Sequence, residues 1–156
     1  MKLLRFGPIG CEKPGLMDDN GHIRDLSDLV QDIGPDTLAP LRLEQLAKYN
    51  LNNLPLVERP SRLGPCVTGV GKLLAVGLNY ADHAAEVELE PPPEPLVVSK
   101  AVSCLAGPND GLVMPKESKC TDYEVEMAVI IGSRAQYVSE ANALDYVAGY
   151  AVMNDY

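Results

Sequence analysis

Two carboxylates, Glu124 and Glu126, lie two positions apart in the otherwise apolar segment DYEVEMAVIIG, residues 122–132. Alternate side chains of a strand share a face, so both would project side by side, about 7 Å apart at their Cβ atoms. Like charges this close to an apolar surface are costly unless a cation neutralises them. Mg²⁺ prefers carboxylate oxygens and keeps several waters. The pair is therefore a candidate metal site, and a solvated acidic face on an edge strand is the alternative.

A second candidate pair is His83 and Glu86 in the segment GLNYADHAAE, residues 77–86. Residues three positions apart lie on the same face of a helix. A carboxylate beside an imidazole orients it, and such a pair can take a proton from water or from a carbon acid. The alternative is an exposed helical pair that contributes only about 0.2–0.5 kcal/mol to stability.

A third acidic residue, Asp155, follows the apolar run Tyr150–Met153 near the end of the sequence. It could supply another carboxylate to the same cation, or it could be an ordinary turn residue. The spacing alone leaves both interpretations open.

The elements that must position these residues are predicted from the apolar pattern of residues 73–156. A buried strand is expected at 73–80 and a helix at 81–90, which the proline run that follows would end. The remaining segments are expected to form a strand at 96–107, a turn and short strand at 107–115, a strand at 122–132, and a helix from Ser139 followed by a returning strand.

Residues 1–70 are predicted to form a small domain of their own, with residues 71–156 as the second domain. We expect a first strand in MKLLRFG, and then a hairpin in 15–26 with a type I′ turn at Asn20-Gly21. Helices are expected at 25–34, ended by Gly34-Pro35, and at 40–50, begun by a proline. A connector with one short strand follows.

Composition excludes several classes of function. The 156 residues carry a net charge of −9, which argues against nucleic-acid binding because no basic patch is available. The longest apolar run is MAVII, so no membrane span is expected, and without an N-terminal apolar leader segment we expect a cytoplasmic protein. The four cysteines form no CxxC pair, so we expect reduced, mostly buried thiols and neither a zinc site nor a disulfide framework.

Four segments in a fixed order carry a family resemblance. VGLNYADHAAE, EPLVVSKAVSCLAGPND, DYEVEMAVIIG and ALDYVAGYAVMND, within residues 73–156, resemble the fumarylacetoacetate hydrolase superfamily. The portion before them resembles the leading domain of bacterial members labelled ureidoglycolate lyase or diketo-sugar-acid hydrolase. The resemblance implies an α+β, mostly β fold. This would be a mixed β-roll, incomplete here, preceded by a small N-terminal α/β module.

The same resemblance implies a metal site. Glu124 and Glu126 match the E-x-E metal ligands of the family, and Asp155 matches its third carboxylate ligand. The implied ion is Mg²⁺ or Mn²⁺, which would act as a Lewis acid toward a small diketo or 2-oxo acid.

The resemblance also implies the catalytic residues. His83, paired with Glu86, would activate a water, and Lys100 would line the substrate site. The implied reaction is hydrolytic or lyase cleavage of a carbon–carbon bond. The alternatives are a decarboxylase, hydratase or isomerase on the same scaffold, and a non-catalytic remnant.

Members of this superfamily continue past the position where this sequence stops at Tyr156. We therefore expect a C-terminally truncated chain that alone is poorly stable or inactive. A homodimer is expected of the full-length form.

Overall fold

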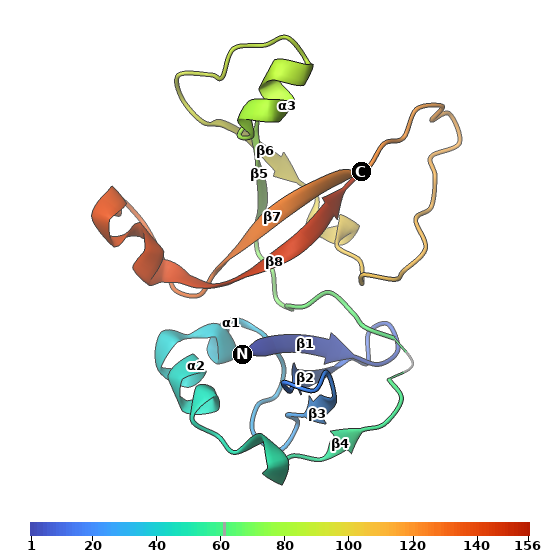
Figure 1. The fold of residues 1–156 in the computed structure, drawn as a ribbon, viewed down its shortest axis with the longest axis vertical. Helices are drawn as coiled ribbons and strands as arrows, with labels where there is room; N and C mark the ends of the chain where they lie inside the picture. The colour runs from blue at the N-terminus through green and yellow to red at the C-terminus, as the bar shows by residue number, and fades with distance from the viewer. Residues whose placement is uncertain (61) are drawn as a thin grey trace. The chain divides into compact units, whose positions relative to one another are not determined.

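The computed structural model describes residues 1–60 and 62–156 and shows a small α+β fold made mostly of strands. Its contacts divide the chain into two units (Figure 1). Unit 1 contains residues 1–69 and 106–156, and unit 2 contains residues 70–105. The chain thus leaves unit 1 after residue 69 and returns to it at residue 106. The expected domains, 1–70 and 71–156, remain a prediction.

Four antiparallel strands near the N-terminus form the larger sheet of unit 1. They are β1 (Lys2–Phe6), β2 (Lys13–Met17), β3 (Ile23–Asp25) and β4 (Leu56–Val57), paired in that order. The first strand and the single short strand of the connector are confirmed. A 3₁₀ turn, η1 (Leu51–Asn53), precedes β4.

The β2–β3 hairpin is confirmed, but its turn is not type I′. Met17 pairs with Ile23, so the loop spans five residues, 18–22. Only Gly21, with φ +82°, has a positive φ there, whereas a type I′ turn needs two such residues. The Asp18 carboxylate stabilises the longer loop because it accepts the N–H groups of Asn20 and His22 at 3.0 and 2.9 Å.

The predicted helix over residues 25–34 is wrong. The chain makes only one turn at residues 27–29. The Asp25 carboxylate accepts the Ser27 N–H at 2.8 Å, and the Asp32 carboxylate accepts the Ile33 N–H at 2.8 Å. Such local side-chain bonds compete with helical hydrogen bonds.

Gly34 begins a helix here instead of ending one. It is the N-cap of α1 (Pro35–Leu38), and α2 (Pro40–Ala47) follows, confirming the second predicted helix with proline at its start. The apolar residues of 25–34 still reach the core, as their spacing indicated. That core contains Leu16, Leu26, Val30, Ile33, Leu38, Leu46 and Leu54.

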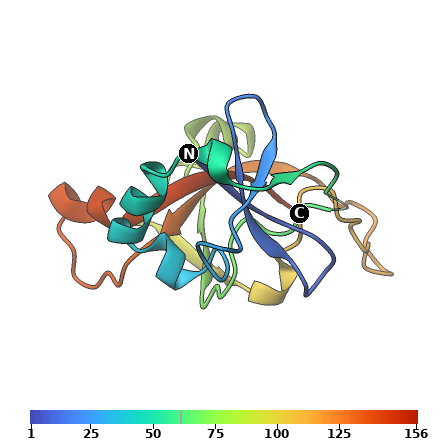
Figure 2. The ribbon, with the colours of Figure 1, turned by 90° about the horizontal axis from the view of Figure 1, so that it is seen from below.

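The second sheet of unit 1 is a long hairpin, visible as the twisted orange and red ribbon in Figure 2. It contains β7 (Glu124–Ile131) and β8 (Val147–Asp155), with η3 (Glu140–Tyr146) between them. Both strands are confirmed. The expected helix after Ser139 forms, but as a 3₁₀ helix.

The base of this hairpin packs against the N-terminal core. Ile130 and Ala148 contact the cluster around Ile33. Gly132 has no room for a side chain, because an added Cβ would lie 2.6 Å from the Leu38 carbonyl oxygen. The hairpin is thereby fixed at one end to α1.

One face of β7 differs from its expected environment. Val125, Met127, Val129 and Ile131 share this face, and all four are exposed. The opposite face, which includes Glu126, is half-buried. An apolar strand face therefore lies in contact with solvent, although its sequence is typical of burial.

Unit 2 is a hairpin of β5 (Leu73–Gly77) and β6 (Leu96–Lys100), with α3 (Ala81–Glu86) between the strands. All three elements begin where they were predicted, but α3 ends four residues early and β6 ends seven residues early. The predicted burial of β5 is wrong, since Leu74 and Val76 are exposed in a sheet of only two strands.

Past the short 3₁₀ turn η2 (Val102–Cys104), the strand expected within 107–115 does not form. The predicted turn is confirmed at 108–109. Here the Asp110 carboxylate accepts the Gly107 N–H at 2.6 Å, a bond that closes a loop and not a strand.

Two further predictions concern membrane-spanning helices and the burial of the cysteine side chains. In the portion covered by the structure, no helix has both the length and the apolar character needed to cross a membrane. Cys11, Cys104 and Cys120 are exposed and Cys66 is only half-buried, so the expectation of mostly buried thiols is wrong.

Candidate functional site

The three carboxylates expected to bind metal lie on one face of the β7–β8 hairpin. Glu124 is directly opposite Asp155 in the antiparallel ladder, and Glu126 is opposite Met153. Directly opposite residues project to the same side with Cβ atoms about 4.5–5.5 Å apart. Residues two positions apart share that side as well. All three carboxylates therefore project from the half-buried face of the hairpin.

The carboxyl groups are not gathered into a preformed metal centre. Over residues 1–60 and 62–156, no three His, Cys, Asp or Glu side chains come close enough to hold an ion. The donor set itself fits a hard cation, because it offers only carboxylate oxygens from one surface. Mg²⁺, Ca²⁺ and Mn²⁺ all suit such a set, since thiolates and imidazoles are absent from it.

His83 and Glu86 come together on α3 in unit 2. Nδ1 of His83 lies 4.0 Å from Oε2 of Glu86, which is within ion-pair range but too long for a hydrogen bond. Both side chains are accessible, with 45% of His83 and 82% of Glu86 exposed. The Asp82 carboxylate accepts the His83 N–H at 2.9 Å in the first turn. The helix therefore sets the spacing of the pair.

Lys100 is the last residue of β6 and lies opposite Leu73 in the ladder. It belongs to unit 2, as do His83 and Glu86. The three carboxylates belong to unit 1. The structure thus brings the predicted site residues together as two groups, each within its own unit.

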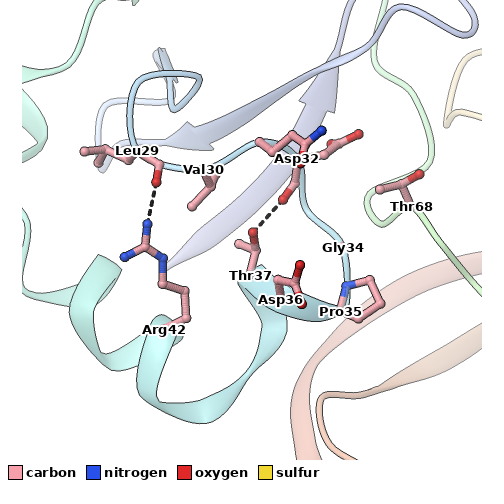
Figure 3. Close-up of a pocket in the computed structure, with 10 residues that line it drawn as sticks. Leu29, Val30, Asp32, Gly34, Pro35, Asp36, Thr37, Arg42 and Thr68 are labelled. Carbon is pink, nitrogen blue, oxygen red and sulfur yellow. Dashed lines mark hydrogen bonds between the residues drawn. The ribbon is translucent and has the colours of Figure 1, made fainter.

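A cleft of about 550 Å³ in unit 1 was missed by sequence reasoning (Figure 3). Thr37 Oγ1 donates to the Asp32 carbonyl oxygen at 2.6 Å, and the Arg42 guanidinium donates to the Leu29 carbonyl oxygen. These polar groups are engaged within the chain, so the cleft offers few of them to a ligand. Its lining comprises Leu29, Val30, Gln31, Asp32, Gly34, Pro35, Asp36, Thr37, Arg42 and Thr68. No signal could have found it, because it depends on the loop that replaces the predicted helix.

A chain of alternating charges in unit 1 was also missed, since its members are far apart in sequence. Arg5 contacts Asp32 at 2.7 Å and Glu12 at 3.5 Å. Arg62 contacts Glu12 at 2.7 Å and Asp110 at 2.6 Å. Four of these side chains are at least four-fifths buried, and Asp32 is slightly more exposed.

The electrostatics of this chain follow from its hydrogen bonds. The Arg62 guanidinium lowers the pKa of Asp110 to about 2, and the Gly107 N–H lowers it further in the same direction. Arg62 also lowers the pKa of Glu12, against the opposing effect of burial. The two carboxylates in turn raise the pKa of Arg62, Asp110 most strongly. All three groups are held in their charged forms.

Comparison with known proteins adds a family assignment. Residues 72–156, more than half of the chain, match the family described as fumarylacetoacetate (FAA) hydrolase C-terminal. A Burkholderia ambifaria protein named "Putative hydrolase" is 54% identical over 155 residues, which are 99% of this chain and 55% of that protein. A Burkholderia orbicola protein with the same description is 53% identical, with the same coverage. The chain thus spans about half the length of the curated relatives it matches.

Two solved structures are similar in fold. A crystal structure of a "putative HpcE protein" from Mycobacterium smegmatis matches with a TM-score of 0.75 and 27% identity. The fumarylacetoacetate hydrolase of the psychrophilic Exiguobacterium antarcticum matches with a TM-score of 0.74 and 29% identity. Each match covers 99% of this chain and 55% of the other. Fold and sequence agree, and this chain belongs to the fumarylacetoacetate hydrolase family.

Proposed function

We propose that this chain carries the metal-binding part of a hydrolase or lyase that cleaves a carbon–carbon bond in a small diketo or 2-oxo acid. The observation that carries the proposal is the common face of three carboxylates on the β7–β8 hairpin, where Glu124 lies opposite Asp155. Membership of the fumarylacetoacetate hydrolase family supports the reaction class. Within it, we propose a relation to the ureidoglycolate lyase and 2,4-diketo-3-deoxy sugar acid hydrolase type.

In this proposal Glu124, Glu126 and Asp155 hold one Mg²⁺ or Mn²⁺ ion. A bound ion would supply a Lewis acid that polarises the oxygens of the oxo acid. The three side chains neutralise the charge of the ion and fix its position on the hairpin. Because all three come from one surface, water and substrate would complete the coordination of a bound ion.

His83 acts as the general base in this proposal. The Glu86 carboxylate beside it orients the imidazole, and a ring nitrogen accepts a proton from water. The water oxygen then bonds to the distal carbonyl carbon of the substrate, and the adjacent carbon–carbon bond breaks. Its electron pair stays with the departing carbon, which takes up a proton, so the products are two acids. Lys100 would stabilise negative charge on substrate oxygens.

Two alternatives use the same residues differently. A decarboxylase, hydratase or isomerase would need the same carboxylates and a different substrate. A non-catalytic remnant would retain the fold without turnover. The exposed apolar faces of β5 and β7 favour this last alternative for the isolated chain, because water reaches surfaces that usually pack.

Titration of the purified chain with Mn²⁺ and Mg²⁺ in an isothermal calorimeter tests the metal site. We expect binding by the wild type and none by the double variant Glu124→Ala, Glu126→Ala. Glu140→Gln is the control, since Glu140 is an exposed acid outside the hairpin strands. Equal affinity in the wild type and the double variant would exclude the site.

A substrate panel tests the reaction. Acylpyruvates, oxaloacetate, diketo-deoxy sugar acids and ureidoglycolate would be incubated with the chain and Mn²⁺, and the products identified. Two acids from an acylpyruvate indicate hydrolysis, whereas loss of CO₂ from oxaloacetate indicates the decarboxylase. His83→Ala should abolish hydrolysis and leave Mn²⁺ affinity unchanged. Metal binding without any turnover would favour the remnant.

The proposal also covers the localisation, partners and oligomeric state of the protein. We propose that the protein acts in the cytoplasm on a small anionic oxo acid, without nucleic-acid or membrane partners, and that it forms a homodimer. Analytical ultracentrifugation of the chain beside a longer Burkholderia relative tests the dimer. We expect it in the relative, and a monomeric relative would contradict it.

A further inference from the structure

Residues 70–105 leave unit 1 and return to it, and both ends of this excursion are anchored within unit 1. The two strands at its root, β5 and β6, start and end opposite each other, with Leu73 paired to Lys100. The anchors lie outside this ladder, since Gly69 is four positions before Leu73 and Gly107 is seven positions after Lys100.

The outgoing end is held by backbone. The Thr68 N–H donates to the Ile33 carbonyl oxygen at 2.9 Å. Gly69 follows with φ +67°, and an added Cβ there would lie 3.2 Å from the ring of Pro35. Close approach and a positive φ together leave this anchor little freedom.

The returning end is held by an ion pair. Nε and Nη2 of Arg62 donate to the two carboxylate oxygens of Asp110, both at 2.6 Å. This two-point geometry is the strong and directional form of an arginine–carboxylate contact. Gly107, three residues before Asp110, lies so close to Leu63 that an added Cβ would collide with its carbonyl oxygen.

Arg62 is itself fixed to the loop between β1 and β2. Its Nη1 donates to Glu12 at 2.7 Å, and its carbonyl oxygen accepts the Gly7 N–H at 2.9 Å. The Arg62 and Asp110 side chains are only 17% and 19% exposed. The pair therefore joins two parts of the chain that are 48 positions apart, with little access to solvent.

We propose that Arg62 is a structural latch that holds residues 107–110, where the chain has returned to unit 1, to the loop that follows β1. By holding Asp110, it limits the freedom of this segment.

Arg24 provides a matched control within unit 1. It forms a comparable ion pair with Asp18 at 3.2 Å, with side chains 18% and 10% exposed. This pair closes the β2–β3 loop, and Arg24 also donates to the Leu54 carbonyl oxygen at 3.5 Å, so neither contact involves residues 101–111. Arg24→Ala and Arg62→Ala would both lower the stability of the chain, but only Arg62→Ala would release residues 107–110.

Amide hydrogen exchange of the full chain tests the latch. In Arg62→Ala we expect exchange over residues 101–111 to accelerate at least about tenfold, with residues 1–6 unchanged. Arg62→Lys should give an intermediate effect, because a single ammonium cannot reproduce the two-point contact. Arg24→Ala should leave residues 101–111 as in the wild type.

Equal protection of residues 101–111 in the wild type and Arg62→Ala would overturn the latch. If Arg62→Ala does not fold, Arg62→Lys and Asp110→Asn decide the matter by the same measurement. Acceleration spread evenly over the whole chain, or shared by Arg24→Ala, would also overturn it.

The exchange experiment requires no metal and no substrate, so it tests the latch independently of the proposed function.

Discussion

Glu124 lies directly across the β7–β8 ladder from Asp155, although 31 positions separate the two residues in sequence. Facing carboxylates on neighbouring strands repel each other in a sheet without a counter-charge. Such a pair is stable where a cation or another positive group neutralises its charge.

The first prediction concerns this pair. Asp155→Asn should weaken Mn²⁺ binding at least about tenfold, because one of three anionic ligands becomes neutral. Calorimetric titration measures the change, and Asp145→Asn in η3 is the control for an exposed acid. Equal affinities in wild type and Asp155→Asn would place the ion elsewhere.

The second prediction concerns Gly107. Gly107→Ala should destabilise the chain by about 1–3 kcal/mol, since its Cβ would collide with the Leu63 carbonyl oxygen. Gly111→Ala, four residues later, has open space and should be nearly neutral. Urea unfolding followed by circular dichroism compares them. Similar midpoints for both variants would contradict the close packing at Gly107.

The third prediction concerns the fixed end of the hairpin. Gly132→Ala should destabilise by about 1–3 kcal/mol, because its Cβ would lie 2.6 Å from the Leu38 oxygen and 2.7 Å from Ala148 Cβ. Gly149→Ala lies in the same hairpin with open space around it. Thermal unfolding of both variants measures the difference. A loss of stability in Gly149→Ala alone would show that the hairpin is held differently.

The fourth prediction concerns pH. The ordinary pKa of the Asp110 carboxyl is 3.8, and the fold lowers it to about 2. A lowered pKa means that this group stabilises the fold above about pH 3.8 and that the stabilisation is lost as the pH falls through about 2. The difference in urea midpoint between the wild type and Asp110→Asn should therefore shrink between about pH 5 and pH 2. A difference that stays constant over this range would contradict the ion pair.

The fifth prediction concerns the loop that replaced a predicted helix. Ile33→Ala should cost about 2–5 kcal/mol, since Ile33 is fully buried in the N-terminal core. Leu41→Ala on the exposed side of α2 should change stability by less than about 0.5 kcal/mol. Urea unfolding measures both. Comparable effects would mean that the core is centred elsewhere.

Apolar periodicity predicted which residues reach the core more reliably than it predicted the backbone that carries them. Leu26, Val30 and Ile33 are buried, as their helical spacing indicated, but they lie on a loop. The carboxylates of Asp25 and Asp32 bind nearby N–H groups and so end the helix that the spacing favoured. The spacing of apolar residues predicts which side chains are buried, but it does not predict which carboxylates will bind nearby N–H groups.

The candidate site, like the fold, could be predicted only in part. The alternation of Glu124 and Glu126 predicted their common face, and the strand that ends at Asp155 was also predicted. The exact pairing with Asp155 depends on the ladder register, including the irregularity at Ile130 and Ile131. The ion pair of Arg62 and Asp110 could not be predicted, because no periodic pattern links positions so far apart.

The exposed apolar face of β7 has a practical consequence for handling the protein. Residues 127–131 contain neither proline nor a charged side chain, the residues that usually act as gatekeepers against intermolecular strand pairing. In the described chain this strand pairs only with β8, which leaves its other backbone edge available to a neighbouring molecule. Concentrated solutions will therefore tend to form β-aggregates through this segment, and Met127→Lys should suppress them.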